Sequence, residues 1–150
     1  MPRCPQPPFS YRDDPAVPAF DETHALFVFD GTCVLCSRGA SMVMRRDRHH
    51  RVNFTPVRSE LGQALYRHYQ VDWNESYLLL SDGRAYTATA GYLQLARILG
   101  GGWRLFRIGA VIPESWSDRV YALVARNRFR WFGKAEHCAL LTAEQRERLL

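Results

Sequence analysis

LFVFDGTCVLC, residues 26–36, is the stretch of sequence that decides the fold. Four apolar residues with high strand propensity stop at Asp30-Gly31, a dipeptide that favours a turn. Cys33 and Cys36 follow at once, where a helix is expected to begin. Two thiols at this spacing on a first helical turn can close a reversible disulfide, and the unpaired N–H groups of that turn favour a thiolate. The stretch therefore predicts a strand, a tight turn and a helix that carries a dithiol at its start.

The residues on both sides extend this pattern into a β-α-β unit followed by a hairpin and a helix. A second short strand ends at Pro56, Ser59 can cap a helix, and Asp82-Gly83 is a strong hairpin signal. The expected strands are 26–29, 52–55, 76–80 and 84–87, and the expected helices are 33–47, 59–69 and 87–99. A Cys-x-x-Cys pair close to a β-α-β pattern is typical of thioredoxin-like proteins. We therefore expect an α/β fold, a thioredoxin-like three-layer domain with a mixed sheet.

Beyond Gly100 the sequence predicts a helical C-terminal extension. Apolar residues recur at helical spacing over 103–111 and 117–126, on either side of Pro113. Thr142-Ala143-Glu144-Gln145 matches a capping box and predicts a final short helix.

The division of the chain follows from its prolines. Most of them lie in the first 18 residues, where they disfavour helices and central strands. We expect a Pro-rich disordered leader over 1–24 and a single domain over 25–150. The leader lacks the apolar centre of a secretory signal, and no apolar run has the length of a membrane span. These features lead us to expect a soluble, cytoplasmic protein.

A basic block near the end of the chain raises the question of nucleic-acid binding. Arginines and a lysine alternate with aromatic residues over 126–134, and the formal net charge is +5. Such a pattern can bind single strands through phosphate contacts and base stacking. The alternation equally fits one face packed on the core while the arginines face water, and we favour this interpretation over a nucleic-acid site.

The cysteines also leave a metal site open. Cys4 lies in the leader and Cys138 near the end, so a disulfide scaffold is not indicated. Cys33 and Cys36 could hold zinc with ligands drawn from His137, Cys138 or the pair at 49–50. There is no second Cys-x-x-Cys, and adjacent His137 and Cys138 are poorly placed to chelate one ion together. We therefore favour redox chemistry without a bound cofactor or metal.

The Asp30-Gly31-Thr32-Cys33-Val34-Leu35-Cys36 signature resembles that of the DCC family of predicted thiol-disulfide oxidoreductases. The resemblance covers roughly residues 26–150, including Trp103-Arg104-Leu105, the basic block and Cys138. It implies a thioredoxin-like fold and that the basic block packs beside the redox centre. Two positions depart from the pattern: Leu141 replaces a frequent proline, and Ser76 stands near the place where thioredoxin-like proteins usually carry a cis-proline.

The motif suggests a role for each polar group. Cys33 is expected to be the nucleophile and the more exposed thiol, and Cys36 the resolving thiol. Asp30 either exchanges a proton with Cys36, raises a nearby thiol pKa, or shapes the turn, and we favour the turn. Cys138 is either a third redox thiol or a small buried residue.

Two classes of function follow from these roles. The first is an enzyme acting on a protein or small-molecule thiol or disulfide, with an electron donor or acceptor that the sequence does not identify. The alternative is a non-catalytic binding module whose cysteines hold zinc or a protein partner.

Overall fold

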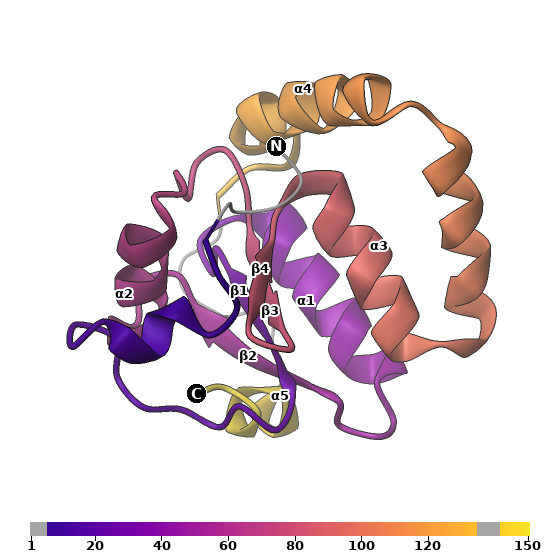
Figure 1. Ribbon diagram of the computed structural model, residues 1–150. Coiled ribbons are helices and arrows are strands. Elements are labelled where there is room, and N and C mark those ends of the chain that lie inside the picture. The colour runs from indigo at the N-terminus through magenta and orange to yellow at the C-terminus, as the bar shows by residue number, and fades with distance from the viewer. Residues whose placement is uncertain (1–5, 135–141) are drawn as a thin grey trace.

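The computed structural model describes residues 6–134 and 142–150 (Figure 1). A four-stranded sheet lies at its centre in the order β2-β1-β3-β4, with bounds β1 Ala25–Phe29, β2 Val52–Pro56, β3 Leu78–Ser81 and β4 Arg84–Tyr86. β1 pairs parallel with β2 and antiparallel with β3, and β4 pairs antiparallel with β3. Because β1 and β2 run parallel, both end at the same edge of the sheet, where the cysteine motif begins.

Helices cover both faces of this sheet. The α-helices are α1 Val34–Arg46, α2 Glu60–Tyr69, α3 Ala88–Leu99, α4 Glu114–Phe132 and α5 Ala143–Glu147, and the 3₁₀ helices are η1 Ser10–Asp13 and η2 Gly101–Val111. α1 and α3 lie side by side on one face, and α2 lies on the other (Figure 1). The expected α/β class with a mixed sheet is confirmed, and the arrangement is consistent with a thioredoxin-like fold.

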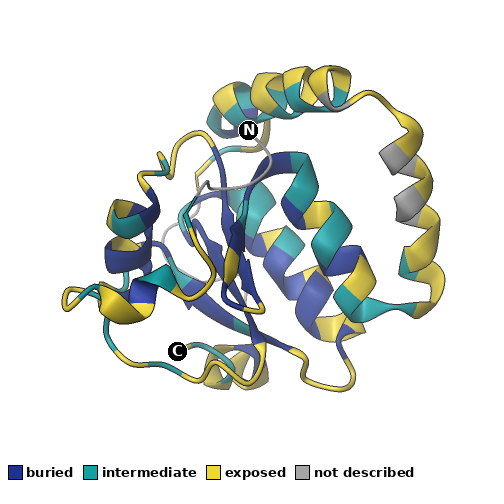
Figure 2. Cartoon of the chain, viewed as in Figure 1, coloured by how far each residue is buried: buried dark blue, intermediate teal, exposed yellow. Residues whose placement is uncertain are grey.

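The apolar run of β1 is buried on both sides. Phe27 and Phe29 belong to the core beneath α1 and α3, whereas Leu26 and Val28 belong to the core beneath α2. Figure 2 shows the sheet as a buried centre between the two helical layers. Burying a side chain of this size stabilises the fold by about 1.5–3 kcal/mol, so β1 anchors the turn that carries the cysteines.

Residues 6–24 differ from the disordered leader that we expected. Tyr11 is buried against α2, and the backbone N–H of Phe9 donates to Gly83 O in the β3–β4 hairpin at 2.7 Å. His68 of α2 contacts the carboxylate of Asp14 at 2.8 Å. Prolines disfavour α-helices and central strands but not packing, and the aromatic residues supply the surface that packs. Residues 1–5, with Cys4, lie outside the described part of the chain.

The C-terminal part differs in detail from the expected helices. Residues 101–111 form a 3₁₀ helix instead of an α-helix, and α4 is longer than the 117–126 expected. The capping box is confirmed: Thr142 Oγ1 accepts from the N–H of Gln145, whose side chain accepts from the N–H of Thr142. Within the described residues, none of the helices combines the length and apolar character needed to cross a membrane.

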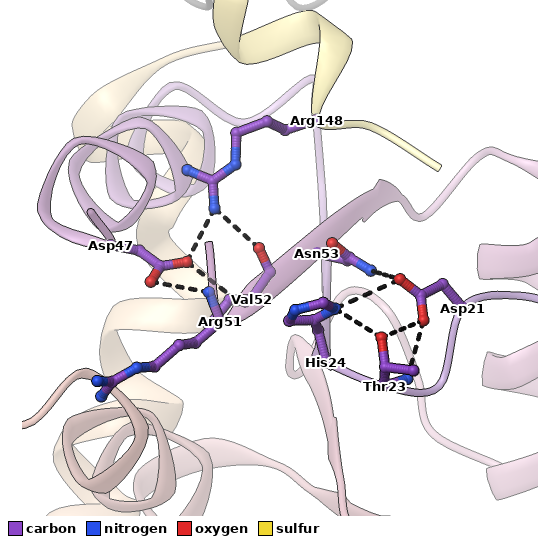
Figure 3. A network of polar contacts seen from close by, with 8 residues as sticks. All are labelled: Asp21, Thr23, His24, Asp47, Arg51, Val52, Asn53 and Arg148. Carbon is purple, nitrogen blue, oxygen red and sulfur yellow. Dashed lines mark hydrogen bonds and ion pairs between the residues drawn. The ribbon is translucent and has the colours of Figure 1, made fainter. Parts of the chain in front are cut away.

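A partly buried ion pair fixes the last helix to the sheet. Arg148 lies 2.8 Å from the Asp47 carboxylate and also donates to Val52 O, while Asp47 accepts from the N–H groups of Arg51 and Val52 (Figure 3). The N–H of Leu150 then donates to Phe54 O at 2.8 Å. This C-terminal segment covers the outer edge of β2, which would otherwise expose unpaired backbone groups.

A close approach of α2 to the end of β2 gives a first prediction. A Cβ added at Gly62 would collide with the carbonyl oxygen of Pro56 and lie 3.0 Å from Val57 Cα, both of them backbone atoms. We expect Gly62→Ala to lower the free energy of unfolding by about 1–3 kcal/mol, measured by urea denaturation. The control is Gly39→Ala in α1, where nothing lies within 4 Å. There, we expect a neutral or stabilising effect of up to about 1 kcal/mol. Equal effects in the two variants would contradict this packing.

Candidate functional site

The turn between β1 and α1 is held by Asp30. One carboxylate oxygen accepts from the backbone N–H of Thr32 at 2.9 Å and from its hydroxyl at 2.7 Å. The N–H of Cys33 donates back to Asp30 O at 3.3 Å. These bonds form the turn that we favoured for Asp30. They place Cys33 at the cap of α1, with extended backbone angles of φ −90° and ψ 120°.

At the helix cap the Cys33 sulfur is surrounded by donors. The Cys36 thiol donates to it, the N–H groups of Cys36 and Leu35 add to this effect, and Arg128 contributes positive charge. Together they outweigh the cost of burial and lower the pKa of Cys33 to about 6. Unpaired amides at a helix start stabilise a thiolate in this way. The sequence contains no His or Lys between the cysteines, so the helix start was the expected source of this effect.

The exposure of the two thiols is the reverse of our expectation. Cys33 has 0% of its surface exposed, whereas Cys36 is partly exposed. Our prediction that Cys33 would be the more exposed thiol is therefore wrong for this conformation. At Cys33 a short antiparallel β-bridge forms with Lys134, just beyond the end of α4, so a distant segment lies against this residue. A residue about 100 positions away thus covers the start of α1.

Cys36 has the opposite electrostatic environment from Cys33. Its bond to Cys33 and its burial raise the pKa of Cys36 well above the usual range, and the negative charge of Asp30 adds to this effect. Cys36 is therefore protonated when Cys33 is a thiolate. Both thiols are free and lie within hydrogen-bond reach of one another. This arrangement provides one ionised and one neutral thiol at the same site.

Arg128 of α4 is a site residue that the sequence reasoning missed. Its guanidinium is buried. Nη1 donates to Cys36 Sγ at 3.3 Å, and Nη2 lies 3.3 Å from the second oxygen of Asp30 and 3.1 Å from Trp73 O. The guanidinium therefore lies between the carboxylate and the resolving thiol. It is the group that joins α4 to the cysteine motif.

The sequence does contain a pattern that places Arg128 on the inward face of its helix. We had expected the alternating arginines to face water, which holds for Arg126 and Arg130. A helix repeats every 3.6 residues, so Tyr121, Ala125 and Arg128 share one face, and it is this face that packs inward. Reading the block with the helical period would have placed Arg128 beside the core.

Ser76 occupies the place where we looked for a cis-proline. No cis peptide bond occurs among the described residues. Instead, Ser76 Oγ accepts from the N–H of Ala88 at 2.9 Å, and Ser76 O accepts from the Tyr66 hydroxyl at 2.9 Å. The Tyr121 hydroxyl lies 3.3 Å from the same Oγ. Side-chain hydrogen bonds thus hold this segment beside α4.

The histidines proposed as zinc ligands do not join the cysteines in the described structure. His49 and His50 follow the far end of α1, about 20 Å along the helix from Cys33. Among the described residues, no three His, Cys, Asp or Glu side chains gather in a way that could hold a metal ion. His137 and Cys138 lie outside the described residues, as does Leu141.

Comparison with known proteins agrees with the geometry of this site. The family described as DCC1-like thiol-disulfide oxidoreductase matches residues 27–134. The chain is 34% identical to the Bacillus subtilis protein YuxK over 127 residues, which cover 83% of this chain and 93% of YuxK. It is 27% identical to a chloroplastic DCC family protein of Arabidopsis thaliana, over 80% of this chain and 72% of that protein. No solved structure matches the chain significantly.

Proposed function

Because this chain belongs to the DCC1-like thiol-disulfide oxidoreductase family, we propose that it exchanges thiols and disulfides through Cys33 and Cys36. The observation that carries the proposal is the pairing of a thiol of lowered pKa at a helix start with a protonated partner thiol. Dithiol oxidoreductases need this difference, since only a thiolate attacks a disulfide. The substrate is a thiol or disulfide, and no bound cofactor is required.

In the first step, the Cys33 thiolate attacks one sulfur of a substrate disulfide. The Cys33–substrate S–S bond forms while the substrate's own S–S bond breaks, and the leaving thiolate takes a proton from water. In the second step, Cys36 loses its proton and attacks the Cys33 sulfur, which releases the second substrate thiol. Two electrons pass from the dithiol to the substrate. A second dithiol returns them to the protein, or the reverse sequence oxidises a substrate dithiol.

Arg128 and Asp30 act on the second step. The Arg128 guanidinium contacts Cys36 Sγ directly, so its positive charge favours the thiolate that Cys36 must become. Asp30 reaches the same guanidinium through its other oxygen. We therefore propose Asp30 as a positioning residue that orients Arg128, in place of the direct proton carrier considered from the sequence.

Access to Cys33 is part of the proposal. Its sulfur is covered in this conformation, and its backbone pairs with that of Lys134. A substrate sulfur can approach along the S–S axis only after this bridge separates. Gly133 precedes Lys134 with a φ of 82°, a value that favours glycine, so it is the point about which this segment would turn.

A redox titration of the metal-free protein tests the proposed function. The protein is equilibrated in graded glutathione buffers, acid-quenched and alkylated, and its pairings are determined by peptide mass spectrometry. We expect one reversible Cys33–Cys36 disulfide. Its midpoint should be less negative than the about −270 mV of thioredoxin, because a lower thiol pKa stabilises the reduced form. A pair that never closes, or a mixture of pairings with Cys4 and Cys138, would exclude the proposal and favour the binding module.

The lowered pKa of Cys33 predicts the pH dependence of exchange. The thiolate is populated above a pKa of about 6 and lost as the pH falls through that value. We expect thiolate absorbance at 240 nm to rise with a midpoint near pH 6, and the rate of disulfide attack to level off above about pH 7. For a thiol with an ordinary pKa of about 8.5, the rate of disulfide attack would keep rising about tenfold per pH unit up to pH 8. Cys33→Ser is the control and should lack the transition near pH 6.

A further inference from the structure

A cavity of about 510 Å³ opens beside the end of β2. Its walls include Val57, Arg58, Tyr66, Arg67 and Trp73, and we call it the arginine pocket. The N–H of Val57 donates to the carbonyl oxygen of Phe29, the residue before Asp30. The pocket therefore lies at the sheet edge where the cysteine motif begins. In α/β sheets, ligands bind outside the carboxyl ends of the strands.

Two walls of the arginine pocket are shared with the redox centre. The carbonyl oxygen of Trp73 accepts from Arg128 Nη2, the nitrogen that also pairs with Asp30. The Tyr66 hydroxyl donates to Ser76 O at 2.9 Å, and Ser76 Oγ lies 3.3 Å from the hydroxyl of Tyr121, on the face of α4 that carries Arg128. A molecule in the pocket would thus lie against the residues that hold the resolving thiol.

The chemistry of the pocket selects for negative charge. Arg58 and Arg67 are both exposed, and no carboxylate lines the cavity. Val57 and the partly exposed Trp73 provide an apolar surface between them. Arginine binds carboxylates through two parallel N–H groups, and the apolar surface suits methylene groups and sulfur. A cavity of this volume accommodates a small molecule.

We propose that the arginine pocket binds low-molecular-weight disulfides that carry carboxylates, and that these are preferred substrates of the Cys33–Cys36 pair. This inference rests on the proposed function, because it names the substrate class of the same dithiol. One carboxylate of the substrate pairs with Arg58 or Arg67, while the disulfide extends toward the start of α1.

Three small disulfides of similar length test the charge preference: dithiodipropionate is anionic, hydroxyethyl disulfide is neutral, and cystamine is cationic. The rate at which each oxidises the reduced protein is divided by its rate with free mercaptoethanol, which removes differences in intrinsic reactivity. We expect the normalised rate to be at least about tenfold higher for the anion than for the neutral disulfide, and lowest for the cation. The preference should shrink as salt is added.

The variant Arg58→Gln/Arg67→Gln should bring the normalised rates for the anionic and the neutral disulfide within about twofold of each other. Arg45→Gln/Arg84→Gln is the matched control, since it removes the same charge from exposed positions on α1 and β4. Equal normalised rates in the wild type, or a preference that survives in the pocket variant, would overturn the inference while the proposed function stands. If none of the three disulfides oxidises the pair, the proposed function itself fails.

Discussion

Replacing Cys36 by serine should stop the reaction after its first step and leave the substrate covalently bound to Cys33. The thiolate of Cys33 still attacks, but no thiol remains to displace the substrate, so multiple turnover falls to the rate of the reaction without protein. The adduct should appear by mass spectrometry as the protein plus one substrate half. A reductant should remove this added mass.

Cys33→Ser is the matched variant, and we expect it to form no adduct and to show no turnover. Together, the two variants also test which cysteine is the nucleophile and which is the resolving thiol. Cys36 is the more exposed thiol in this conformation, whereas Cys33 has the lower pKa. A stable adduct on Cys36 in Cys33→Ser, with none on Cys33 in Cys36→Ser, would reverse the two roles.

Replacing Arg128 by methionine should lower the free energy of unfolding by about 3–5 kcal/mol, because it leaves the buried carboxylate of Asp30 without its counter-charge. Asp30 is 4% exposed and Arg128 5% exposed, so water cannot substitute for the missing partner. The melting temperature should fall by roughly 6–20 °C for a domain of this size. Denaturant unfolding measures the loss.

Two further variants separate charge from packing. Asp30→Asn/Arg128→Met removes both charges and should recover most of the lost stability, because no unpaired ion remains. Arg128→Lys keeps the charge, but one ammonium cannot reach Cys36, Asp30 and Trp73 O as the planar guanidinium does. A loss below about 1 kcal/mol in Arg128→Met would show that the ion pair does not hold α4 to the motif.

The local parts of the fold could be predicted from the sequence because local physics decides them. The apolar run of β1, the cap at Ser59 and the capping box at Thr142 are all found as expected. The strand is predicted by a run of adjacent apolar residues, and each cap by a side-chain hydrogen bond across one helical turn. The dithiol at the start of α1 belongs to the same class of feature.

The remaining features of the site depend on contacts between distant residues. Cys33 is buried where its backbone pairs with that of Lys134, and the positive charge beside Cys36 comes from Arg128. Neither contact has a local signature near the cysteines. The packing of residues 6–24 was not expected for a related reason. Their prolines restrict only the local backbone, whereas the burial of Tyr11 depends on its contact with α2.

The distance along the chain between Cys36 and Arg128 also matters during synthesis. These two residues are 92 positions apart. At about 5–20 residues per second, the ribosome adds Arg128 roughly 5–20 s after Cys36. During this interval the growing chain carries the dithiol without its guanidinium or the covering segment at Lys134. In the growing chain Cys33 is therefore more accessible than in the folded protein, while Cys36 lacks the positive charge that favours its thiolate.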